Sequence, residues 1–189
     1  MKETTGCSYI QLAFVLLLAG GFLLQGCVTP NPPATVANVD LGQYAGLWYE
    51  ISKFPQFFER GLVGVTAEYT LEEDGRVRVV NSGFQGSFDA EKTSVEGYAT
   101  APDPTDTAKL RVRFDFFPAS LFPADYWIVA LGDDYEYAVV SNPKRNTLWI
   151  LSRTPTMDTE VYEGIVADLA TRGFAVENLE RMPQTPEQL

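Results

Sequence analysis

Gly46-Leu47-Trp48-Tyr49-Glu50-Ile51 opens the first strand-like run of the chain, Leu47 to Lys53. A second run, Val65 to Glu72, alternates apolar with polar residues at the period of two that a half-exposed strand shows. The stretch Glu72-Glu73-Asp74-Gly75 then predicts a tight hairpin into the next run. The chain therefore begins as an antiparallel meander.

Further strand-like runs follow at hairpin spacing. They are Arg76 to Asn81, Thr93 to Thr100, Ala108 to Phe116, Tyr126 to Leu131, Tyr135 to Ser141 and Thr147 to Arg153. The last three are apolar on both faces, so another element must cover their outer side. An amphipathic helix after Pro155 is predicted as this cover, with Asp158 as its N-cap and Gly173 at its C-terminal end. A short ninth strand is predicted over residues 174–179, and residues 83–89 are predicted as a glycine-rich connection.

The order of elements predicts an all-β fold, an eight-stranded antiparallel up-and-down β-barrel with one C-terminal α-helix packed outside. The interior of a barrel with this number of strands can just hold one small ligand. Apolar positions on the inward parity are predicted to line it: Val65, Ala67, Tyr69, Val77, Val79, Val95, Leu110, Val112 and Phe114. Trp127 and Tyr137 are added from two runs in which both faces are apolar. No cationic side chain is expected inside, and the acidic residues of Val65 to Glu72 and Ala108 to Phe116 fall on the outward parity.

Alternate connections of a meander barrel lie at one end, and here those connections are aromatic. The predicted rim consists of Phe54, Phe57, Phe58, Arg60, Phe117, Leu121 and Phe122. An apolar rim suits the entrance for a hydrophobic ligand, a surface that touches a membrane, or a homodimer interface. Alternatively, the rings fill the mouth of a dry barrel. Arg60 is a candidate partner for an anionic headgroup, or a solvated loop charge.

Composition excludes several classes of function. The 189 residues carry 14 Lys and Arg against 25 Asp and Glu, a net charge of -11, which argues against nucleic acid as a partner. The chain has no histidine, which removes His-based triads, His-ligated zinc and a proximal-His haem. We therefore expect no metal and no cofactor.

The N-terminal segment has the pattern of an export signal. The apolar stretch from Tyr9 to Leu24 is shorter than the roughly 20 residues of a comfortable membrane span and contains two glycines. If the signal is removed before Cys27, Cys7 leaves with it. Thiol catalysis is then not expected in the remaining domain, which would contain no second cysteine.

Gly46, Trp48 and Arg153 resemble the glycine-x-tryptophan and terminal arginine signatures of the lipocalins. Asp133-Asp134-Tyr135 is similar to the middle signature of that family, with Gly132 or Asp133 in place of threonine. Two longer stretches resemble the bacterial outer-membrane lipoprotein lipocalins, which are related to apolipoprotein D. They are 58–62 and 148–155.

The resemblance implies a calyx whose base is closed by the Trp48 ring, with the Arg153 guanidinium packed over it. This contact is worth roughly 0.5 to 2 kcal/mol. Leu24-Gln25-Gly26-Cys27 also resembles the lipobox of bacterial lipoproteins, which implies acylation of Cys27. An ordinary secreted protein with a stray thiol is the alternative. Val28, rather than aspartate, after the cysteine is similar to the outer-membrane sorting pattern.

These inferences divide the chain into four parts. They are a lipoprotein signal peptide over 1–26, a lipidated N-terminus and proline-rich tether over 27–39, a lipocalin domain over 40–182, and a polar tail over 183–189. The tether is expected to hold the domain away from the membrane.

The resemblance implies a non-catalytic, outer-membrane-anchored protein that faces the periplasm and binds, stores or transports fatty acids such as palmitate, or lysophospholipids, in envelope maintenance. Two alternatives remain open. The first alternative is a lipoprotein scaffold whose aromatic rim binds a protein partner. The second is an enzyme that modifies a lipid or isoprenoid. The enzyme would need paired carboxylates inside the barrel.

Overall fold

The structure is a computed structural model and describes residues 31–189. Its strands are β1 (Gly46–Lys53), β2 (Leu62–Leu71), β3 (Val77–Gln85), β4 (Lys92–Thr100), β5 (Lys109–Phe114), β6 (Ala124–Leu131), β7 (Tyr137–Ser141), β8 (Leu148–Ser152) and β9 (Glu180–Arg181). The predicted signal peptide (1–26), Cys7 and the acylated Cys27 lie outside the described residues. Within residues 31–189, no helix is both long and apolar enough to cross a membrane.

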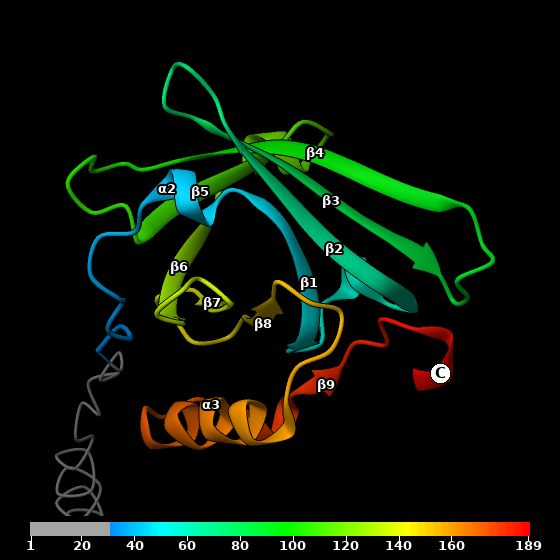
Figure 1. Cartoon of the computed structure of the whole chain (residues 1–189). Coiled ribbons are helices and arrows are strands. Elements are labelled where there is room, and N and C mark those ends of the chain that lie inside the picture. Colours follow the sequence, from blue (N-terminus) through cyan, green and yellow to red (C-terminus); the bar gives the residue numbers. More distant parts are fainter. Residues whose placement is uncertain (1–30) are drawn as a thin grey trace, which may run out of the picture. The chain divides into compact units, whose positions relative to one another are not determined.

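The strands close into a barrel. Consecutive strands from β2 to β8 pair as antiparallel neighbours, and β1 pairs with both β8 and β2 (Figure 1). Trp48 lies opposite Ala67 across the β1–β2 junction, and Tyr49 lies opposite Ser152 across the β1–β8 junction. The predicted eight-stranded antiparallel barrel is confirmed.

Two groups of apolar side chains stabilise this fold, one on each side of the barrel wall. The buried members of the inner cluster are Val39, Tyr44, Trp48, Tyr69, Val77, Val79, Ala99, Ala108, Leu110, Val112, Ile128, Ala138, Val140 and Leu151. Those of the outer cluster are Ile51, Phe54, Val129, Val139, Leu148, Ile150, Ile165, Leu169 and Phe174. The inner cluster lines the interior, and the outer cluster joins the wall to the helix.

The helix is α3 (Thr159–Thr171), which lies along the outside of the barrel below β7 and β8 (Figure 1). Asp158 caps it, since the side chain accepts hydrogen bonds from the amides of Glu160 and Val161. Gly173 follows the helix with a φ of 77°, the left-handed conformation that ends helices. Ile165 and Leu169 are buried in the outer cluster, so the predicted amphipathic cover is confirmed.

Two strand boundaries differ from the predictions. The predicted ninth strand over 174–179 is wrong, because this segment packs Phe174 into the outer cluster and forms a short 3-10 helix, Val176–Asn178. The ninth strand, β9, comes afterwards and pairs with Ser52 and Lys53. The predicted connection over 83–89 is partly strand, since β3 continues to Gln85 and pairs with Leu62 of β2.

The C-terminal segment completes the wall between β1 and β2. The Gln184 side-chain amide donates hydrogen bonds to the carbonyls of Glu50 and Val65, both at 2.7 Å. The amide of Gly64 donates to the carbonyl of Pro183 at 2.8 Å. Gln184, which is predicted as part of a polar tail, therefore bridges β1 and β2, and Pro183 pairs with β2.

The predicted tether is docked against the barrel in its described part, residues 31–39. Val39 is 3% exposed, and its backbone amide donates to the hydroxyl of Thr107 at 2.8 Å. The amide of Val36 donates to the carbonyl of Ile128 at 3.0 Å. The described part of the predicted tether therefore packs its apolar residues Val36 and Val39 against the inner cluster.

Candidate ligand-binding site

The base of the barrel is closed by Trp48 and Arg153. Trp48 is fully buried, and the guanidinium carbon of Arg153 lies 3.8 Å from the centroid of its ring. The Trp48 indole N–H donates to the carbonyl of Tyr44 at 2.8 Å, at the end of the one-turn helix α2 (Leu41–Tyr44). Arg153 also donates to the carbonyls of Gln43, Tyr44, Leu47 and Tyr135. These bonds join α2, β1 and the β6–β7 turn at one end.

Gly46 suits this position for two reasons, its backbone conformation and its closeness to Arg153. Its φ is 99°, and a Cβ at this position would lie 3.3 Å from the Arg153 Nη1 atom. Tyr135, from the middle signature, has a φ of 57°, and its carbonyl accepts from Arg153 Nε at 3.2 Å. The residues that carried the family resemblance therefore meet at one place.

Most residues predicted to line the interior do so. Tyr69, Val77, Val79, Leu110 and Val112 are buried in the inner cluster, and Ala67 and Phe114 pack against it. Val65 is also buried, at 7% exposed. Val95 shares the inward register, because it pairs with Asn81, but it is 41% exposed.

The predicted places of Trp127 and Tyr137 inside the barrel are wrong. Both pack against the outer cluster, and Ile128, Ala138 and Val140 face the interior instead. A register shift between Ile128 and Ala130 also interrupts the alternation of β6. Because both faces of these strands are apolar, only the position of the helix decides which face is outside.

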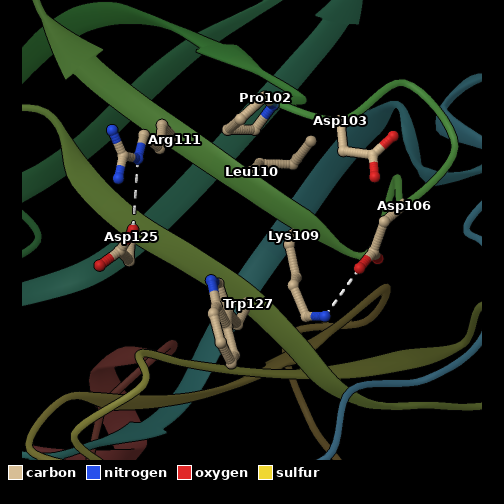
Figure 2. Close-up of a pocket in the computed structure, with 8 residues that line it drawn as sticks. All are labelled: Pro102, Asp103, Asp106, Lys109, Leu110, Arg111, Asp125 and Trp127. Atoms are coloured by element: carbon tan, nitrogen blue, oxygen red, sulfur yellow. Dashed lines mark hydrogen bonds and ion pairs between the residues drawn. The ribbon is translucent and has the colours of Figure 1, made fainter. Parts of the chain in front are cut away.

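Trp127 borders a hollow on the outer surface (Figure 2). The hollow has a volume of about 190 Å³. Four of its five charged side chains form ion pairs: Lys109 with Asp106 at 2.7 Å, and Arg111 with Asp125 at 3.5 Å. Since exposed ion pairs of this kind are common on solvated surfaces, the hollow is a weaker candidate than the interior.

The aromatic rim lies at the end of the barrel opposite Trp48. The side chains of Phe57, Phe58, Phe117, Leu121 and Phe122 are between 56% and 83% exposed. Arg60 is exposed at the same end. Phe54 is not part of the rim, contrary to the prediction: it is 5% exposed and belongs to the outer cluster. Its amide donates to the carbonyl of Leu148, which fixes it beside β8.

Two charged residues of β1, Glu50 and Lys53, face the interior, which was not predicted from the sequence. Glu50 is 3% exposed and pairs with Leu151, a member of the inner cluster. A β-bulge between Glu50 and Ser52 then reverses the alternation, so that Lys53 pairs with the inward-facing Trp149. Alternation along the strand from the inward-facing Trp48 predicts that Glu50 faces inward, but it predicts that Lys53 faces outward.

Lys53 forms a buried ion pair with Glu59 of the loop that follows β1. Its Nζ atom lies 3.0 Å from Glu59 Oε2, and both side chains are less than 10% exposed. Glu59 is in the short helix Phe57–Glu59 of the β1–β2 loop, and it also accepts from the Trp149 indole N–H at 3.5 Å. The expectation that no cation lies inside is therefore wrong, and the buried carboxylates Glu50 and Glu59 come from β1 and the loop after it, outside the two runs whose acidic residues are predicted to face outward.

Three tyrosine hydroxyls meet inside the barrel above the base. Tyr126 shares hydrogen bonds with Tyr44 at 2.7 Å and with Tyr69 at 2.9 Å. Burial, the largest cause, raises the pKa of Tyr69 to about 12. Two bonds among three hydroxyls leave one O–H proton without a partner in the group. The interior is thus apolar with polar groups at defined places.

A closed eight-stranded barrel with an apolar interior, a sealed base and a rim at the other end defines a calyx that can enclose a small hydrophobic molecule. Residues 39–184 match the lipocalin-like domain. The chain belongs to this family.

Individual relatives agree with this assignment. The outer membrane lipoprotein Blc of Citrobacter freundii is 41% identical over 172 residues, which cover 89% of this chain and 94% of that protein. Apolipoprotein D of Bos taurus is 35% identical over 158 residues, 79% of each chain. Insecticyanin from the tobacco hornworm Manduca sexta has the same fold, with a TM-score of 0.66 and 23% identity over 82% of this chain and 86% of that one. The predicted relationship to the lipoprotein lipocalins and apolipoprotein D is confirmed.

Proposed function

We propose that the protein is a non-catalytic carrier that binds fatty acids or lysophospholipids in its calyx and stores or transports them at the outer membrane. The observation that carries this proposal is the apolar inner cluster beneath the exposed rim. Burial of about 16 methylene groups contributes on the order of 12 kcal/mol before the costs of association. An acyl chain is therefore a ligand that such an interior can retain.

The proposed location has two supports, one from a relative and one from the N-terminal sequence. Two properties support it: a similar protein is named an outer membrane lipoprotein, and Cys27 is in a lipobox-like context. Several acyl chains on one cysteine anchor a protein effectively permanently. Membrane attachment at Cys27 would place the carrier at the surface that supplies its ligands.

The test is native mass spectrometry with lipid extraction on the chain that begins after Cys27, purified without detergent. A fatty acid or lysophospholipid should co-purify. The variant Val112→Phe should lose most of it, because Val112 is buried in the inner cluster. Val161→Phe is the matched control, since Val161 is on α3 and 42% exposed. Equal lipid content in the two variants would contradict binding in the interior.

A protein-binding scaffold is the second candidate. It is favoured by the exposure of Phe57 and Phe117, at 83% and 80%. An empty barrel that also failed to bind titrated fatty acids and lysophospholipids would exclude the carrier and favour the scaffold.

A further inference from the structure

The headgroup preference of the calyx can be inferred from Glu50. Its side chain points into the barrel, because its cross-strand partner Leu151 belongs to the inner cluster. It is 3% exposed, and its Oε1 atom has no hydrogen-bond partner among the described residues. A buried polar atom without a partner costs free energy, which a ligand that supplies the partner recovers.

A second oxygen inside the barrel, Oδ1 of Asn81, is also buried without a hydrogen-bond partner among the described residues. Asn81 faces inward, because its cross-strand partner Ala67 packs against the inner cluster. The carboxyl of Glu50 and the side-chain amide of Asn81 each keep an oxygen that can accept, so a ligand that donates a hydrogen bond would satisfy them.

The charges beside Glu50 disfavour an anionic headgroup. Lys53 is the neighbouring cation, and it is already paired with Glu59 at 3.0 Å. Burial, and secondly the charge of Glu59, raise the pKa of Glu50 well above its usual range. Glu59 would likewise repel a carboxylate placed here, because charges interact strongly in a buried site.

We propose that Glu50 is the polar recognition group of the calyx, and that it selects amphiphiles whose headgroup donates hydrogen bonds and carries no net negative charge. A monoacylglycerol has this chemistry, whereas a free fatty acid does not. The inference rests on the proposed function and narrows it, because among the amphiphiles that the interior can hold it ranks those with a hydrogen-bond-donating headgroup and no net negative charge above fatty acids.

The test is a competition among ligands that share one acyl chain. The full chain, stripped of bound lipid, is incubated with an equimolar mixture of 1-monooleoylglycerol, oleate and methyl oleate, and the retained ligands are extracted and quantified. Monooleoylglycerol should be retained about 10-fold over each of the others, which corresponds to one hydrogen bond to a buried group. This preference tests the proposal without any variant.

Variants then assign the preference to one side chain. Glu50→Leu should reduce the selectivity to within about 2-fold, whereas Glu50→Gln should keep it, because the amide oxygen still accepts. Glu68→Leu is the matched control, since Glu68 is exposed on the outer face of β2. Circular dichroism verifies that each variant is folded.

The outcomes separate this inference from the proposed function. If the wild-type chain retains none of the three amphiphiles, the carrier function itself fails. If it retains oleate best, or shows no preference, the carrier stands and the role of Glu50 is excluded. Unchanged selectivity in a folded Glu50→Leu variant also overturns the inference.

Discussion

Gly46 shows at the residue scale how a backbone conformation maintains the base. Its φ of 99° is in the region that L side chains rarely adopt, and a Cβ there would lie 3.3 Å from Arg153 Nη1, so Arg153 would have to shift slightly. Gly75, in the β2–β3 hairpin, has a φ of 81° but no atom within 4 Å of the Cβ position. Substitutions at the two glycines can therefore distinguish the cost of the backbone conformation, which both share, from the cost of the contact with Arg153, which only Gly46 has.

We predict that Gly75→Ala lowers the free energy of unfolding by about 1 to 2 kcal/mol, the cost of a left-handed L residue. Gly46→Ala should cost at least about 1 kcal/mol more, because it also displaces Arg153 from Trp48. Urea unfolding followed by tryptophan fluorescence measures both. Equal losses would mean that the Arg153 contact adds nothing at Gly46.

Glu50 and Lys53 show which inward-facing residues of β1 the sequence can predict and which it cannot. Alternation from Trp48 places Glu50 inside, so a strict reading of parity identifies it from the sequence. The same alternation places Ser52 inside and Lys53 outside, which is the reverse of the structure. The bulge between Glu50 and Ser52 has no local signature in the sequence, and it brings Lys53 to Glu59.

At the scale of elements, the outer cluster depends on α3. Leu169 is fully buried between this helix and the barrel wall, whereas Val161 is 42% exposed on the same helix. Both lie within one helix, so they share its backbone environment and differ in burial.

We predict that Leu169→Ala destabilises the fold by about 2 to 5 kcal/mol, because it leaves a cavity in the outer cluster. Val161→Ala should change stability by at most about 0.5 kcal/mol. The midpoint of urea unfolding by far-ultraviolet circular dichroism distinguishes the two. Similar small changes would show that the helix contributes little to the stability of the wall.

At the scale of the whole molecule, the distribution of apolar surface is uneven. The rim gathers exposed aromatic side chains at one end of a chain with a net charge of -11. Exposed apolar patches of this kind commonly mark interaction surfaces. We propose that, besides admitting ligand, the rim supports weak homodimers.

We predict concentration-dependent dimers in analytical ultracentrifugation. The double variant Phe117→Ser, Phe122→Ser should remain monomeric where the wild-type chain self-associates, because these rings are 80% and 73% exposed. Leu47→Ser is the control, since Leu47 is 42% exposed near the base. A wild-type chain that stays monomeric throughout would exclude the homodimer.

The sequence by itself determined the barrel, its helical cover and much of its lining. In β2 to β5, one face is apolar and the other charged, so alternation alone places Tyr69, Val79 and Val112 inside. The tertiary structure decided the rest. In β6 and β7 both faces are apolar, so the helix selects which face is buried against it and turns Trp127 and Tyr137 outward. In β1, a bulge that depends on the pairing with β8 brings Lys53 inside, where Glu59 from the loop that follows β1 compensates its charge. The helix α3 and strand β8 are distant in sequence from the strands whose inward faces they decide, whereas periodicity reports only local order.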